Sequence, residues 1–160
     1  MRNGYALPSS QGLKRVSEKL GAMSSQEIES LRGKLRIGVH WDTQVTLDGC
    51  KHAVTQAYCS ALPVAYCSHS SKSWEPFARL VLEGAYEATF IVAILNAKRT
   101  SNRRLYLTSL GGGAFGNETQ WIYDAMRRSI ERFAHWDLDV RLVSYGNSNP
   151  QTKRFIQSLG

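Results

Sequence analysis

The sequence has little of what builds disulfide scaffolds or metal sites. Its 160 residues include only 3 cysteines and 4 prolines. No two cysteines form a Cys-x-x-Cys pair, and no histidine lies at metal-ligand spacing beside Cys50, Cys59 or Cys67. The sequence therefore predicts no metal site and no cofactor. The odd cysteine count indicates reduced thiols and a cytoplasmic or nucleocytoplasmic location.

A long uninterrupted hydrophobic run is also missing. The most apolar stretch, residues 77–95, is broken by Arg79, Glu83 and Glu87, so we expect no membrane span and no membrane partner. The first residues lack the apolar core of a secretory signal.

Positive charge is in excess, with a net charge of +7. This charge suits an anionic ligand or a nucleic acid. The basic residues are scattered, however, and the four tryptophans are not interleaved with a basic stripe. A nucleic-acid partner is therefore a possible alternative but is not favoured.

Strand-like and helix-like stretches alternate from Arg36 onward, which is typical of an α/β domain. Hydrophobic residues make up 42% of the chain, enough for one core. We expect a flexible tail over residues 1–12 and one domain over residues 13–160. The patterns predict strands at 35–46, 52–59, 104–110 and 140–145, and helices at 13–20, 24–33, 74–97, 118–134 and 152–159. The stretch from Arg104 to Tyr145 should form a βαβ crossover with parallel strands, whereas the mutual direction of the first two strands stays open.

A glycine-rich segment lies between the predicted strand at 104–110 and the helix at 118–134. It reads Gly111, Gly112, Gly113, Ala114, Phe115, Gly116 and Asn117. Such a loop at a helix N-terminus lets backbone N–H groups approach a phosphate. It lacks the Lys-Ser/Thr of a Walker loop and the acidic residue of a dinucleotide fingerprint. A tight turn whose glycines serve packing alone is the alternative.

The strand, Gly-Gly-Gly-Ala-Phe-Gly-Asn loop, helix and strand together resemble the second half of a macrodomain. The segments 42–46 and 52–60 resemble its opening strands, although Val54-Thr55-Gln56-Ala57-Tyr58 lacks the family's asparagines. The likeness is closest to ADP-ribosyl hydrolases related to poly(ADP-ribose) glycohydrolase, but the two glutamates of that enzyme's catalytic loop are missing. The resemblance implies a three-layer α/β/α domain with a mixed, largely parallel sheet. The chain could also be the C-terminal part of a longer protein whose N-terminal region completes the site.

The resemblance also implies roles for particular residues. The diphosphate of ADP-ribose would lie on the loop 111–117, with Phe115 as a lid over the ribose or a plug against the core. Asp42, followed by Thr43, would position a water at the distal ribose or bind the adenine amino group. Asp48 could assist as a general base if it reaches the ligand, although forming the Asp-Gly turn is its favoured role. The remaining ligand contacts would come from Gln56, Ser60, Pro63, Tyr145 and Asn147, with core packing as the alternative for Tyr145.

The expected function is binding of ADP-ribose or an ADP-ribosylated protein, with hydrolysis of the ribosyl linkage as the expected activity. A non-catalytic reader of ADP-ribosyl groups and a basic nucleic-acid-binding protein are the two alternatives. The oligomeric state cannot be read from the sequence.

Overall fold

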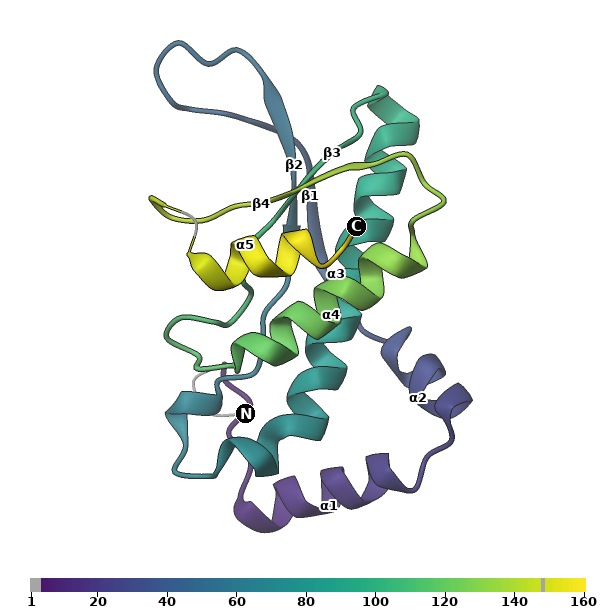
Figure 1. Ribbon diagram of the computed structural model, residues 1–160, viewed down its shortest axis with the longest axis vertical. Helices are drawn as coiled ribbons and strands as arrows, with labels where there is room; N and C mark the ends of the chain where they lie inside the picture. The colour runs from purple at the N-terminus through teal and green to yellow at the C-terminus, as the bar shows by residue number, and fades with distance from the viewer. Residues whose placement is uncertain (1–3, 148) are drawn as a thin grey trace.

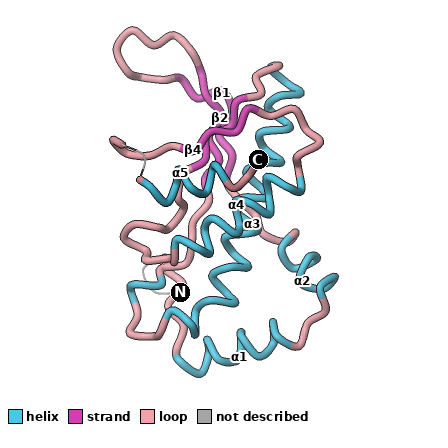
Figure 2. The backbone as a smooth tube through the Cα atoms, in the orientation of Figure 1, coloured by secondary structure: helices cyan, strands magenta, loops and turns pink. Residues whose placement is uncertain are grey.

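The computed structural model describes residues 4–147 and 149–160 (Figure 1). In these residues the chain is a mixed α/β protein with five α-helices and two small two-stranded sheets, which confirms the expected α/β class. The strands gather in one half of the molecule, and α1 and α2 lie at the other end (Figure 2). The elements are α1 (Ser10–Gly21), α2 (Ser25–Arg32), β1 (Gly38–Gln44), β2 (Ala53–Tyr58), the 3-10 helix η1 (Val64–Tyr66), α3 (Ser71–Thr100), β3 (Arg104–Leu107), α4 (Thr119–Arg132), β4 (Asp139–Leu142) and α5 (Pro150–Gln157).

The first two strands form an antiparallel hairpin, which settles the direction that the sequence left open. The register runs from Gly38 opposite Tyr58 to Gln44 opposite Ala53, and it shifts between His40 and Thr43. Asp42 lies within this bulge with a φ of 54°, a left-handed conformation that aspartate tolerates better than most residues.

The predicted crossover from Arg104 to Tyr145 is confirmed. β3 and β4 are parallel, with Arg104 opposite Asp139 and Leu107 opposite Leu142, and α4 connects them. Both strands are shorter than expected: β3 ends at Leu107, where the chain turns toward the glycine loop, and β4 ends at Leu142.

The long helix α3 runs antiparallel to β2. Thr55 of β2 donates a hydrogen bond to Asn96 of α3 (2.7 Å). Cys59, which follows β2, lies 3.9 Å from the hydroxyl of Thr89, an earlier residue of the same helix. Later residues of β2 thus lie beside earlier residues of α3, so the two elements run in opposite directions.

β3 is also antiparallel to α3, so β2 and β3 run in the same direction. β3 begins just after α3 ends, and the hydroxyl of Tyr86 donates to the carbonyl of Thr108, directly after β3 (2.7 Å). Within the described residues, however, β2 pairs only with β1 and β3 only with β4. In place of the expected mixed, largely parallel sheet, the described residues therefore form two separate two-stranded sheets, one antiparallel and one parallel.

α3 forms the centre of the core and is covered on several sides. Its fully buried side chains include Trp74, Ala78, Leu82 and Phe90. The 3–4 spacing of apolar residues predicts a buried stripe of Phe77, Leu80, Val81, Ala85, Ala88 and Val92, but only Ala85 and Val92 are buried and the other four are half-buried. By length and composition alone α3 could cross a membrane, but a core helix passes the same test, and α3 packs against α1, α4 and both sheets.

Charged residues join α3 to its neighbours. Arg32 of α2 pairs with Glu83, and Arg128 of α4 pairs with both Glu87 (2.8 Å) and Glu29 (2.6 Å). Burial alone would raise the pKa of Glu29, but the guanidinium groups around it, led by that of Arg128, outweigh burial and lower the pKa. These paired carboxylates are structural.

Of the expected tail at residues 1–12, residues 1–3 lie outside the described residues and residues 10–12 belong to α1. Ser9 caps α1 by accepting a hydrogen bond from Gly12 N, so this helix begins at Ser10, earlier than expected. The carbonyl of Pro8 contacts the ring of His69 (3.1 Å). At the start of α2, Ser24 and Glu27 form a capping box.

Candidate functional site

The segments that follow β2, β3 and β4 meet at one edge of the strands. Val143, just after β4, donates to the carbonyl of Leu107 at the end of β3 (2.8 Å). Asn117 at the end of the glycine loop donates to the carbonyl of Leu62, in the segment after β2 (2.8 Å). This carboxyl-terminal edge of parallel strands is where open α/β folds bind ligands.

Two glycines of the loop are required by packing. Gly111 (φ 74°) and Gly116 (φ 66°) are left-handed, and a Cβ on either would overlap the segment after β2. At Gly116 that Cβ would lie 2.8 Å from the Cβ of Ala65. The packing interpretation of the glycines is therefore correct for these two positions.

Asn117 and Tyr86 hold the two ends of the loop. Asn117 is buried, and its amide also donates to the carbonyl of Gly111 (3.3 Å), so its side chain closes the loop on itself. The hydroxyl of Tyr86, which donates to Thr108, accepts from the N–H of Leu110 (3.0 Å). Burial raises the pKa of Tyr86 well above its ordinary value, which keeps this hydroxyl protonated.

The tip of the loop presents free donors. Gly112, Gly113 and Ala114 are exposed. Among the hydrogen bonds of the described residues, the N–H groups of Gly113, Ala114 and Phe115 donate to no protein group. Three consecutive N–H groups beside the N-terminus of α4 can bind an anion. Glu118, at the N-cap, makes no side-chain capping bond, and its exposed carboxylate would oppose an anion bound there.

An aromatic cluster that the sequence did not predict borders the loop. The ring of Phe115 meets Tyr66 edge-on at 5.4 Å and Tyr5 at 6.0 Å, and these tyrosines lie 5.2 Å apart. Tyr66 and Tyr5 are 45% and 39% exposed, so each offers ring surface beside the loop. The η1 segment holds the cluster in place, because Ala65 N donates to the carbonyl of Phe115 (2.9 Å).

Four other expected ligand residues lie near this edge. Ser60 is exposed, Pro63 is buried at the start of η1, and Tyr145 and Asn147 are exposed after β4. Since the side chain of Tyr145 is fully exposed, its alternative role in core packing is wrong.

The remaining predicted residues lie elsewhere. Asp42 is at the opposite end of β2, where it pairs with Arg99 (2.8 Å), and Thr43 is beside it. Asp48 is exposed in the turn between β1 and β2. Gln56 lies in the middle of β2, where its side chain contacts the hydroxyl of Tyr58. The structure thus separates both candidate catalytic carboxylates from the glycine loop.

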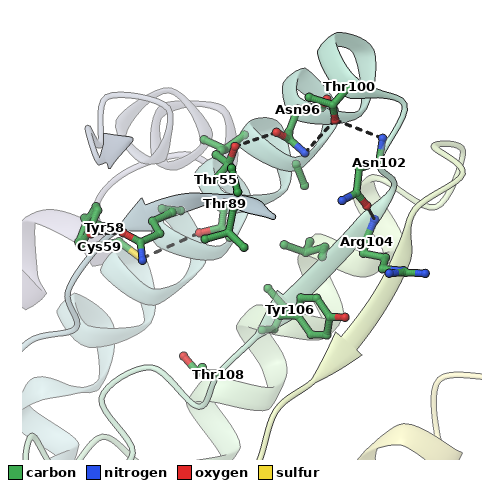
Figure 3. A pocket seen from close by; sticks show the side chains of 18 of the residues that line it. Thr55, Tyr58, Cys59, Thr89, Asn96, Thr100, Asn102, Arg104, Tyr106 and Thr108 are labelled. Atoms are coloured by element: carbon green, nitrogen blue, oxygen red, sulfur yellow. Dashed lines mark hydrogen bonds between the residues drawn. The ribbon is translucent and has the colours of Figure 1, made fainter. Parts of the chain in front are cut away.

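A groove of about 920 Å³ lies between β2 and β3 (Figure 3). Its floor is α3, contributed by Tyr86, Thr89, Val92, Ala93 and Asn96. Cys59 lines one wall, and burial raises the pKa of its thiol, with the Thr89 hydroxyl acting in the opposite sense. A protonated thiol with no base beside it is a poor nucleophile.

No protein-family model matches the chain, and no curated protein or solved structure is detectably similar to it. Within residues 4–147 and 149–160, no three His, Cys, Asp or Glu side chains gather as a metal site would require.

Proposed function

We propose that this chain binds ADP-ribose, free or attached to a protein, at the edge formed by the glycine loop. The observation that carries the proposal is the row of three free N–H groups at Gly113, Ala114 and Phe115. They are exposed or half-buried in the loop that leads into α4, four to six residues before its first residue, Thr119, and free backbone N–H groups in such a loop can bind a diphosphate.

The aromatic cluster borders the glycine loop, and we infer that it binds the adenine. Tyr66 offers an exposed ring beside the loop, held by edge-on contacts to Phe115 and Tyr5. A nucleobase can stack on such a ring. Tyr145 is the alternative stacking residue, exposed on the neighbouring segment.

The resemblance to macrodomains adds a proposal about architecture. The common direction of β2, β3 and β4 is compatible with one mixed sheet in a three-layer α/β/α domain. Completing it requires a strand in the gap and a cover for the sheet face on which Tyr58 and Tyr106 are exposed.

Hydrolysis of the ribosyl linkage is a separate proposal with less support. It depends on Asp42, which the structure pairs with Arg99 at the far end of β2. Turnover of an ADP-ribosylated protein that is lost in Asp42→Asn would support hydrolysis. Binding without any turnover by the unaltered chain would leave the reader function alone.

Calorimetric titration with ADP-ribose tests the binding proposal. Ala114→Glu places a negative charge at the exposed loop tip, and Ala114→Gln is its neutral control of similar size. A like charge about 5 Å from the diphosphate costs on the order of 1 kcal/mol, which is a loss of roughly fivefold to tenfold. No binding by the unaltered chain, or equal binding by the two variants, would refute the proposed site.

The same titration locates the adenine. Tyr66→Ala should weaken ADP-ribose binding by about fivefold to a hundredfold, because stacking contributes about 1–3 kcal/mol per base. Tyr145→Ala should have little effect. If Tyr145→Ala weakens binding and Tyr66→Ala does not, the adenine binds on the segment after β4.

A further inference from the structure

Two strand edges face each other across the groove between β2 and β3. β2 pairs with β1 on one side and β3 pairs with β4 on one side, so in the described part of the chain the other edge of each is unpaired. Consecutive residues of both strands line the groove, from Ala53 to Cys59 and from Arg104 to Thr108. Both edges border the same space, as Figure 3 shows.

We propose that this groove is an acceptor site for one β-strand, donated by a partner polypeptide and running parallel to β2 and β3. This inference is independent of the proposed ADP-ribose binding.

The volume of the groove agrees with one strand. A strand that fills a gap in a sheet occupies about 4.8 Å in width, about 10 Å in depth and about 3.3 Å per residue, or about 160 Å³ per residue. The groove volume of about 920 Å³ therefore corresponds to about six residues, and β2 itself has 6.

The backbone of β3 is set up for pairing on the groove side. The carbonyls of Arg103 and Leu107 accept hydrogen bonds from the strand region of β4. In a parallel ladder alternate residues face the same neighbour, so the backbone of Tyr106 faces the groove. Outside the strand ladders, no hydrogen bond of the described residues involves the N–H or the carbonyl of Tyr106, which agrees with this orientation.

The walls define the chemistry of the incoming strand. Toward α3 its side chains would meet the apolar Ala57, Val92, Ala93 and Leu105 with the polar Thr89 and Asn96 among them, so small or β-branched residues such as valine fit there. On the face that points away from α3, the side chains of the incoming strand would lie between Tyr58 of β2 and Tyr106 of β3. Both tyrosine side chains are more than half exposed, so threonine fits on this face.

Charge and pairing favour a partner over a second copy of this chain. Arg104, at the start of β3, is exposed and makes no salt bridge within the described residues, so an acidic first residue would complement it. A second copy offers no suitable donor, because each of its described strands is already paired along one edge, whereas the groove requires a strand with both edges free.

Hydrogen exchange with mass spectrometry tests the proposal on the full chain. The probe is a capped hexapeptide that begins with glutamate and then alternates valine and threonine. At ten times its Kd it should slow amide exchange in residues 53–59 and 104–108 about tenfold. The same peptide N-methylated at alternate residues should give no protection, because it cannot pair with both edges.

Tyr106→Pro removes the N–H that faces the groove and leaves the β3–β4 ladder intact, whereas Tyr106→Thr keeps that N–H. We expect protection to be lost in the first variant and kept in the second. The proposal is overturned if millimolar peptide gives no protection, if the N-methylated peptide protects equally, or if Tyr106→Pro binds like the unaltered chain. Should Tyr106→Pro not fold, the comparison of the two peptides decides alone.

Discussion

Replacing Gly111 by alanine should destabilise the fold far more than the same change at Gly113. Gly111 has a φ of 74°, and its new Cβ would overlap the Cβ of Ala61 and lie 2.7 Å from the Asn117 amide nitrogen. The left-handed conformation costs roughly 1–2 kcal/mol for a residue with a Cβ. Overpacking against Ala61 adds about 1–3 kcal/mol. We therefore expect Gly111→Ala to lose about 2–5 kcal/mol of unfolding free energy.

Gly113 is the matched control, because a Cβ there meets nothing within 4 Å and its φ is not positive. Gly113→Ala should change the unfolding free energy by no more than about 0.5 kcal/mol. Urea denaturation followed by circular dichroism measures both variants. For a chain of this size, a loss of about 2–5 kcal/mol also lowers Tm by roughly 4–20 °C. Equal stability of the two variants would refute the packing that we assign to Gly111.

Three further predictions concern the surroundings of the loop. Tyr86→Phe removes the hydroxyl that accepts from Leu110 N, and should cost about 1–2 kcal/mol in urea denaturation; an unchanged midpoint would contradict the anchoring role. Arg128→Ala should cost about 1–3 kcal/mol at neutral pH. Because the folded pKa of Glu29 is lowered, its contribution is present above its unfolded pKa of about 4.3 and is lost as pH falls through the folded value. The variant should therefore lose less stability on acidification than the unaltered chain, and equal losses would contradict the pairing. Glu118→Gln should raise ADP-ribose affinity several-fold in calorimetry, because it removes a negative charge from the helix N-terminus; a lower affinity would place the ligand elsewhere.

The crossover from Arg104 to Tyr145 could be predicted because its signals are local. Four glycines follow the strand closely, and the apolar side chains of α4, such as Trp121, Ile122 and Ala125, recur at helical spacing and are buried. The glycine loop therefore lies where the sequence placed it, between β3 and α4.

The buried face of α3 could not be predicted in the same way. Periodicity identifies one apolar stripe, but α3 contacts elements on several sides, so residues such as Trp74, Ala78 and Phe90 are buried off the expected stripe. The pairing of its glutamates with Arg32 and Arg128 likewise depends on α2 and α4, which lie far away in sequence.

The site was predicted only in part for the same reason. Tyr5 and Tyr66 reach Phe115 across long separations in sequence, and no local pattern marks them. Asp42 and Asp48 were expected beside the ligand, but the direction of β2 places them at the opposite end from the glycine loop. That direction is set by pairing with β1 and contacts with α3, which the sequence left open.

The proposed strand acceptor and the proposed ADP-ribose site should affect each other. A strand running parallel to β3 would end at the edge where the glycine loop begins, so its last residues would lie beside Leu110, which lines the groove. Ordering that edge should change the affinity for ADP-ribose, and linkage requires ADP-ribose to change the peptide's affinity by the same factor. Calorimetric titrations of ADP-ribose with and without saturating hexapeptide, and the reciprocal pair, measure both factors. A coupling of about 1 kcal/mol would appear as roughly fivefold in each direction. If neither ligand changes the affinity for the other, the strand acceptor and the ADP-ribose site do not share this edge.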